Sequence, residues 1–195
     1  MSKCIFVLAS CFMLSIPLTA QSIQSAEGKG ISVRVGASFS TFNPDYGCDS
    51  NAPWACWEGQ VMGISPSVST NAFLFERIGA EGQARFLQWH GPGGLTESSY
   101  MAGPRVKILR HKRVTFSGKF LIGVGHLSIS RGTGAGTYLA YAPGGLVDYA
   151  LTRRLFARFD YEYQFWPTFG SSSGSGHGGL TPNGLSLGII YSLRR

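Results

Sequence analysis

The sequence predicts an all-β fold, and three observations support this prediction. Short runs alternate between apolar and polar side chains, which is the two-residue period of strands, whereas the period of amphipathic helices is almost absent. Glycine and aromatic residues are frequent, with 27 Gly, 13 Phe, 8 Tyr and 4 Trp among 195 residues. Beyond residue 20, no apolar run approaches the roughly 18 residues of a membrane helix. Any later membrane crossing would therefore use strands.

The clearest alternation lies in residues 155–166. Successive side chains of a strand point to opposite faces, so this segment has one apolar face and one polar, largely charged face. The apolar face carries Ala157, Phe159, Tyr161, Tyr163 and Phe165, and the polar face carries Arg158, Asp160, Glu162 and Gln164.

Seven further segments bring the number of predicted strands to eight: residues 31–40, 60–70, 78–89, 99–108, 114–128, 138–150 and 185–193. Segment 60–70 alternates poorly, because Pro66 and several serines interrupt it. In the well-patterned segments the polar face is small or charged, and most segments have the roughly ten residues that a tilted strand needs to cross hydrocarbon. The pattern predicts a closed antiparallel eight-stranded up-and-down transmembrane β-barrel with its apolar face outwards.

This orientation predicts a polar network inside the barrel. Eight strands enclose a space just wide enough to be filled by side chains, so the inward charges must pair and the lumen is plugged. The alternative is a soluble lipocalin-like ligand-binding barrel, in which the apolar face points inwards. The predicted network comprises Arg34, Glu81, Arg85, Arg105, Lys107, Lys119, Asp148, Arg158, Asp160 and Glu162.

The connections alternate in length, with short ones at 71–77, 110–113 and 151–154 and longer ones at 43–59, 90–98, 129–137 and 167–184. Bacterial membrane barrels have short periplasmic turns and long external loops. Basic residues gather at the short-turn end, where we expect them to meet anionic phospholipid headgroups. They are Arg77, Arg110, Lys112, Arg113, Arg153, Arg154, Arg194 and Arg195.

Aromatic residues near both ends of the predicted strands fit two interfacial girdles. Near the long loops lie Trp89, Tyr100, Tyr138, Phe165 and Trp166, and near the short turns lie Phe73, Phe75, Phe116, Tyr149 and Tyr191.

The first twenty residues have the layout of a secretory signal peptide: basic Lys3, an apolar run over 4–16, then a polar end. We expect a signal peptide over 1–20, a short periplasmic segment over 21–29 and the barrel over 30–195. Export to an oxidising compartment predicts a disulfide between Cys48 and Cys56 in the first long loop. Export also argues against a nucleic-acid partner for this basic chain.

Several phrases of the sequence resemble the small OmpA-like outer-membrane β-barrel proteins of Gram-negative bacteria. They lie at residues 80–85, 100–105, 118–123 and 160–163, and the resemblance covers residues 30–195. It implies a compact eight-stranded barrel in the outer membrane, with a structural role in the envelope or a role in adhesion and interaction through surface loops. The sequence departs from the family at its end, where Arg194 and Arg195 replace the usual final aromatic residue.

A second resemblance is narrower. Lipid A deacylases are also eight-stranded outer-membrane barrels with a lipid-facing His, Ser and carboxylate, and His126 and Ser128 look like the first two. An outer-membrane esterase is therefore an alternative function. The third group is missing, because residues 139–141 are Leu139, Ala140 and Tyr141 where a carboxylate is wanted.

The remaining expectations concern ligands and partners. His90, His111, His126 and His177 lack the spacing of metal ligands, so we expect neither metal nor cofactor. The expected partners are outer-membrane lipids, both lipopolysaccharide and phospholipid, and an extracellular partner bound by loops 43–59, 90–98, 129–137 and 167–184. We expect a monomer that is not an enzyme.

Overall fold

The computed structural model describes residues 32–44, 59–71, 77–91, 94–129, 134–169 and 179–193. The chain divides into two compact units, Met1–Gly30 and Ile31–Arg195, and every described residue lies in the second. The predicted signal peptide, the segment 21–29 and the disulfide between Cys48 and Cys56 lie outside the described residues, so they stay predictions. Within the described ranges, no helix is long and apolar enough to span a membrane.

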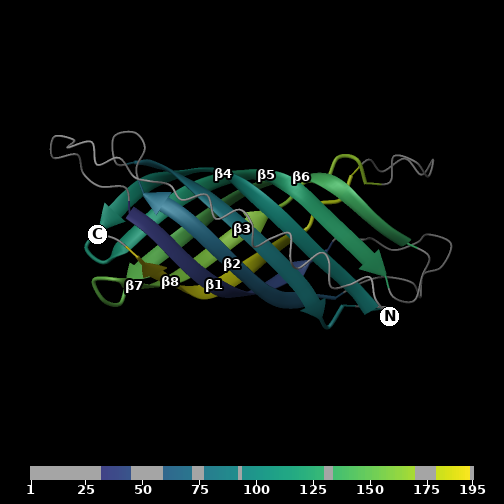
Figure 1. Ribbon diagram of the computed structural model, residues 1–195, viewed down its shortest axis with the longest axis horizontal. Helices are drawn as coiled ribbons and strands as arrows, with labels where there is room; N and C mark the ends of the chain where they lie inside the picture. Colours follow the sequence, from purple (N-terminus) through teal and green to yellow (C-terminus); the bar gives the residue numbers. More distant parts are fainter. Residues whose placement is uncertain are drawn as a thin grey trace, which may run out of the picture. The chain divides into compact units, whose positions relative to one another are not determined.

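Eight antiparallel strands form one closed barrel in which each strand pairs with its neighbours in sequence and the last pairs with the first (Figure 1). All eight predicted strands are present. Their bounds are β1 Ser32–Asn43, β2 Val61–Asn71, β3 Ile78–Trp89, β4 Leu95–His111, β5 Val114–Ile129, β6 Gly134–Ala150, β7 Leu155–Tyr163 and β8 Asn183–Ser192.

Two strands begin four residues earlier than the sequence predicts. β4 starts at Leu95 rather than residue 99, and β6 starts at Gly134 rather than residue 138. The extensions are Leu-Thr-Glu-Ser at 95–98 and Gly-Ala-Gly-Thr at 134–137, and their mostly small or polar side chains give no clear apolar alternation. β7 ends at Tyr163, and the predicted last residues of that segment form two isolated bridges, Tyr141 with Phe165 and Trp166 with Leu180.

The faces of β7 settle which side of the barrel is apolar. Phe159 and Tyr161 are each 46% exposed on the outside, whereas Arg158 and Glu162 are 2% and 1% exposed inside. The same alternation continues around the closed sheet, with apolar side chains outwards. The soluble lipocalin-like alternative is therefore wrong, because it requires the aromatic face to line the interior.

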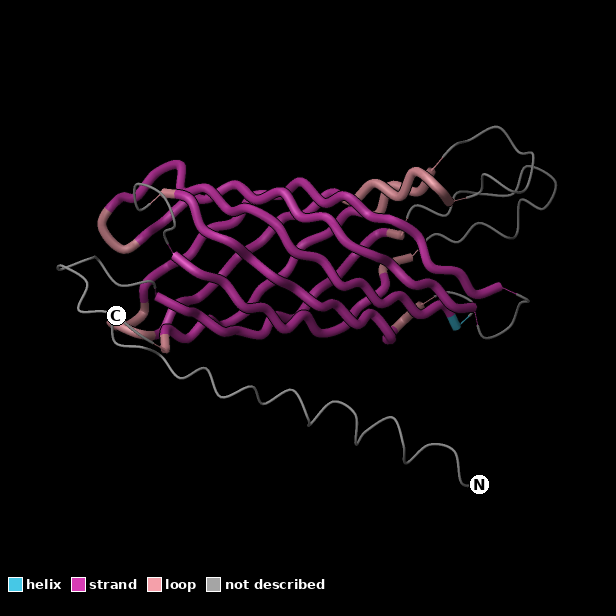
Figure 2. Tube along the Cα trace, turned by 45° about the horizontal axis from the view of Figure 1, so that its top comes forward, coloured by secondary structure: helices cyan, strands magenta, loops and turns pink. Residues whose placement is uncertain are grey.

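Local chemistry shapes the described tight turns, which lie at the same end of the barrel as the end of β8 (Figure 2). In the β4–β5 hairpin His111 pairs with Val114, and Lys112 has a φ of 50°, as a two-residue turn requires. In the β6–β7 turn, the Thr152 hydroxyl accepts hydrogen bonds from the backbone N–H groups of Arg154 and Leu155 at 3.3 and 3.0 Å. The long first and last connections, 44–60 and 164–182, are confirmed by the strand bounds. The predicted long connections 90–98 and 129–137 shorten to 90–94 and 130–133 because β4 and β6 begin early, so the predicted alternation in length is wrong at these two places.

Candidate functional site: a sealed lumen

The lower part of the lumen, towards the short turns, holds an ionic network. Nine of the ten predicted members appear in ion pairs inside the barrel, and Lys107 lies on the same inward face, partly exposed nearer the rim. Alternation along the strands brings these side chains in from six of the eight strands, β1 and β3 to β7. Charges taken out of water must be paired, so the network is closely packed and its members depend on one another.

Asp148 is the centre of one half of the network. Arg158 reaches it from the neighbouring strand β7, with Nε 2.8 Å from Oδ1, and Arg105 reaches it across the lumen, with Nη2 2.5 Å from Oδ2. Arg34 adds a longer contact of 3.5 Å. Glu81 Oε2 links the same two arginines, at 3.4 Å from Arg105 and 3.3 Å from Arg158. Guanidinium groups suit this role because their forked donors can contact two carboxylates at once.

Lys119 is the centre of the other half. Its Nζ lies 2.6 Å from Asp160, 2.8 Å from Glu162 and 3.7 Å from Glu81, so one ammonium group faces three carboxylates. It also donates to Gln83 Oε1 at 3.0 Å. A compact ammonium with three donors fits a site where acceptors converge from several strands.

A chain of polar contacts leads upwards from the network. Arg85 Nη1 donates to Glu162 Oε1 at 2.8 Å, and Gln164 Nε2 donates to the same oxygen at 2.9 Å. The indole N–H of Trp166 then donates to Gln164 Oε1 at 2.8 Å. The guanidinium of Arg85 also lies over the ring of Phe42, 3.9 Å from its centroid. The buried indole N–H of Trp166 therefore keeps a hydrogen-bond acceptor where the polar and apolar layers of the lumen meet.

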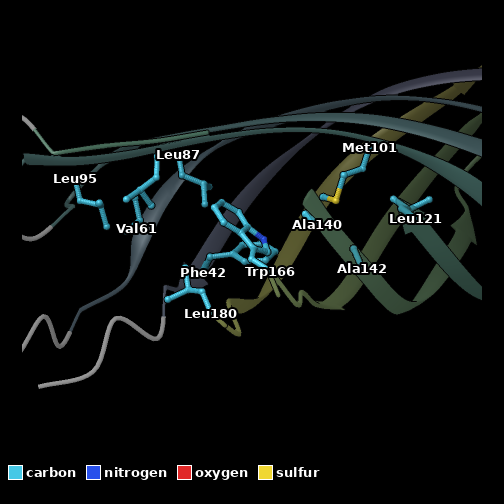
Figure 3. Packing of buried hydrophobic residues seen from close by; sticks show 11 residues of the cluster. Phe42, Val61, Leu87, Leu95, Met101, Leu121, Ala140, Ala142, Trp166 and Leu180 are labelled. Atoms are coloured by element: carbon cyan, nitrogen blue, oxygen red, sulfur yellow. The ribbon is translucent and has the colours of Figure 1, made fainter. Parts of the chain in front are cut away.

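Above the network, an apolar plug fills the lumen at the long-loop end. Figure 3 shows Phe42, Leu87 and Leu180 grouped around the buried Trp166. Tyr138 and Phe169 pack against the plug. Its buried members are Phe42, Val61, Leu87, Leu95, Met101, Leu121, Leu127, Ala140, Ala142, Trp166 and Leu180.

The sequence does not predict this plug, because the alternation along the strands indicates an inner face that is polar throughout. In the sequence, the polar faces of the strands are interrupted by Leu87, Leu121 and Leu127. These three apolar residues are the signal from which the plug could have been predicted. The girdle assignment of Tyr138 and Trp166 is also wrong, since both side chains point into the lumen. Trp89, Tyr100 and Phe165 at one end and Phe116, Tyr149 and Tyr191 at the other are exposed outwards, as predicted.

Glu97 is an inward acidic residue, although the sequence predicts a loop at this position. The early start of β4 turns its side chain into the lumen, where Glu97 is 1% exposed. Neither of its carboxylate oxygens has a hydrogen-bond partner in the described part of the chain, nor does the hydroxyl of the nearby Ser99. Glu97 thus differs from every carboxylate of the predicted network, because each of those has a close ion pair.

Similar solved structures show the same architecture. Neisserial surface protein A (NspA) has a TM-score of 0.55 and 15% sequence identity, over 85% of this chain and 99% of that one. The outer membrane protein OprG from Pseudomonas aeruginosa has a TM-score of 0.55 and 10% identity, over 84% of this chain and 96% of that one. No protein-family model and no curated protein matches the sequence.

The chain has the fold of the small outer-membrane β-barrels. The resemblance predicted from the sequence is confirmed at the level of fold. The apolar outer face, the closed strand order and the paired interior charges are what a barrel of this type needs in a bacterial outer membrane.

The outer face of the barrel also holds the two candidate catalytic residues. His126 and Ser128 point outwards from β5, and His126 Nδ1 lies 2.9 Å from Thr137 Oγ1 on β6. Within the described ranges, the carboxylates of β4 to β7 point into the lumen instead. A hydroxyl therefore occupies the position beside the imidazole where a deacylase needs its orienting acid.

The remaining predicted features of the barrel are at its rims. Arg77, Arg110, Lys112, Arg113, Arg153 and Arg154 are exposed at the short-turn end, whereas Arg194 and Arg195 lie outside the described residues. The described residues contain no cluster of His, Cys, Asp or Glu that could hold a metal ion.

Proposed function

We propose that this protein is a non-conducting outer-membrane barrel that serves as a rigid anchor, either as a structural component of the envelope or for surface loops that make contacts outside the cell. The observation that supports this proposal is the double filling of the lumen. A solute crossing the barrel would have to displace both the ionic network and the apolar plug around Trp166.

Each layer alone is enough to block a small ion. In the lower layer, most of the charged side chains are held by two or more partners, so opening a path would separate paired charges in a low-dielectric interior. In the upper layer, the side chains of the buried leucines cannot replace the hydration shell of an ion. The lumen is therefore filled, and contacts with other molecules are made by the outer surface and the loops.

Planar-bilayer recording tests the closed lumen. We expect no conductance steps from the wild-type protein, from Arg85→Ala, which cuts the ionic layer, or from Trp166→Ala, which cuts the apolar layer. Folding of each variant is checked by heat-modifiable migration on a gel. Regular steps from the folded wild-type protein would contradict the proposal.

Action through the loops needs a separate test. Cells displaying the wild-type barrel are compared with cells displaying a barrel whose loops 43–59 and 167–184 are shortened, and adhesion to surfaces and to other cells is measured. Loss of adhesion in the shortened barrel supports a role in interaction. Equal adhesion, together with altered envelope integrity in a deletion strain, supports the structural role instead.

The short-turn rim supports retention in the membrane. The exposed apolar residues Ile108 and Leu109 lie next to Arg110, and Lys112 and Arg113 follow in the same hairpin. Apolar side chains beside basic ones are suited to the interface of a leaflet with anionic headgroups, where each basic group contributes on the order of 1 kcal/mol. We propose that this hairpin contacts the phospholipid of the inner leaflet.

A further inference from the structure

One stretch of the outer face is hollowed. A depression of about 610 Å³ lies on the outside of β2 to β5. In its central row, Val68 pairs with Gly82, Gly82 with Ala102, and Ala102 with Ile122, so two small residues form a floor between two larger walls. Tyr100 and Ala84 form the next row towards the long loops. The depression is therefore an apolar groove that runs beneath Tyr100.

A polar patch lies two rows above the central row of this groove, on β4, β5 and β6. Ser98 of β4 pairs with His126 of β5, which pairs with Thr137 of β6. Thr96 pairs with Ser128 in the next row. Their side chains alternate with inward ones and so point outwards. Below this level, the outward positions of β4, β5 and β6 down to the short-turn rim are apolar, aromatic or glycine, so the patch interrupts an otherwise apolar surface.

The patch has an internal hydrogen bond but retains unused capacity. His126 Nδ1 and Thr137 Oγ1 lie 2.9 Å apart, and Thr96 Oγ1 donates to the backbone carbonyl of Ser128 at 3.4 Å. An imidazole has a second ring nitrogen, and a hydroxyl can both donate and accept. The patch can therefore bind a group rich in oxygen atoms, such as a sugar or a phosphate.

The spacing of patch and groove matches the depth profile of a lipid. Ser98 and Ala102 are four residues apart on β4, which is about 13 Å along a strand and roughly 10 Å of depth at the usual tilt. Half of a bilayer's hydrocarbon core is about 15 Å thick. With the patch at the level of the headgroups, the groove lies among the acyl chains of the same leaflet.

We infer that this face of β2 to β6 is a seat for one lipid A molecule of the outer leaflet. One acyl chain lies in the groove over Gly82 and Ala102, and the phosphorylated sugar headgroup bonds to the patch around His126. The long-loop end of the barrel faces the outer leaflet, whose lipid carries such a headgroup. The inference rests on that orientation, which is part of the proposed function, but not on the closed lumen.

The groove is tested by a matched pair of glycine variants. A Cβ at Gly82 would lie 3.4 Å from Val68 Cγ1, an ordinary contact, and a Cβ at the outward Gly145 of β6 would meet no atom within 4 Å. Gly82→Leu therefore fills the groove, and Gly145→Leu adds the same side chain to a part of the outer face outside the groove. We expect Gly82→Leu to retain lipid A roughly tenfold less, the weight of about two buried methylene groups, and Gly145→Leu to match the wild type.

The measurement is native mass spectrometry of the folded barrel in detergent, titrated with purified lipid A and, separately, with phosphatidylglycerol and phosphatidylethanolamine. We expect one retained lipid A and weaker retention of both phospholipids. Equal retention of all three lipids, equal behaviour of the two leucine variants, or a dimer in place of a lipid adduct would each overturn the inference.

The patch is tested independently by the double variant His126→Phe with Thr137→Val. It is expected to lose the preference for lipid A over phosphatidylglycerol while still holding a hydrocarbon chain. Thr41→Val on β1, an outward threonine near the same rim across the barrel, is the control and keeps the preference. A preserved preference in the double variant would contradict the inference, even if Gly82→Leu failed to fold. The lipid measurements do not depend on whether the lumen conducts ions. A negative result for the lipid A seat therefore leaves the closed lumen to be judged from the conductance recordings.

Discussion

The same substitution at two buried glutamates of the lumen is predicted to change the stability of the barrel differently. Glu162 lies 2.8 Å from both Arg85 and Lys119 and accepts a hydrogen bond from Gln164 at 2.9 Å. Glu97 is equally buried but has no hydrogen-bond partner in the described part of the chain. Glutamine has nearly the shape of glutamate, so replacing either residue removes a charge without creating a cavity.

The magnitudes follow from the contacts. Glu162→Gln takes the counter-ion from two buried cations, and breaking such a pair costs about 3 to 5 kcal/mol. The value expected here is near the lower limit, because the glutamine oxygen can still accept a hydrogen bond. Glu97→Gln removes a carboxylate that no donor satisfies, a group whose burial costs about 1 to 3 kcal/mol. We therefore expect Glu97→Gln to leave the stability of the barrel unchanged or to raise it by up to that amount.

The assay is guanidinium unfolding of the purified barrel in detergent, followed by tryptophan fluorescence and by the fraction of heat-modifiable protein on a gel. The midpoint should fall for Glu162→Gln and stay or rise for Glu97→Gln, with equal slopes for both. Equal destabilisation by the two variants would refute the reasoning, since it would mean that Glu97 has ionic partners comparable to those of Glu162.

Three further outcomes are expected. Arg158→Ala should destabilise the detergent-solubilised barrel by about 3 to 5 kcal/mol, because Asp148 and Glu81 lose a buried partner, whereas Arg153→Ala in an exposed turn should change stability by less than about 0.5 kcal/mol; similar melting shifts would mean that the inner face is wrongly assigned. Replacing Arg110, Lys112 and Arg113 together by glutamine should weaken binding to vesicles with anionic lipid but not to zwitterionic vesicles. Equal binding of this variant and the wild type to anionic vesicles would contradict the proposed phospholipid contact. Incubation with lipid A should release no fatty acid, and release that depends on His126 would restore the esterase alternative.

Strand content, strand number and orientation were predictable because they depend on local patterns. In β7, aromatic residues at every second position and charges between them fix both the extended conformation and the two faces. A barrel of eight strands leaves too little space for the aromatic set inside, and the charges can pair only there. The ten predicted network residues all lie on the inner face for this reason.

The layering of the lumen was decided only by the tertiary structure. The two-residue period tells which face a side chain occupies, but not its height along the barrel or its partners across the lumen. Height depends on the register between strands, which sets Trp166, just beyond the end of β7, beside Phe42 of β1 and Leu87 of β3 and makes an apolar plug. The same non-local register draws Glu97 into the interior, although its own neighbours are serine and threonine and give no alternation. The sequence alone therefore determined the strands of the barrel wall and which face of the sheet points outwards. Tertiary packing determined which side chains fill the lumen at each height.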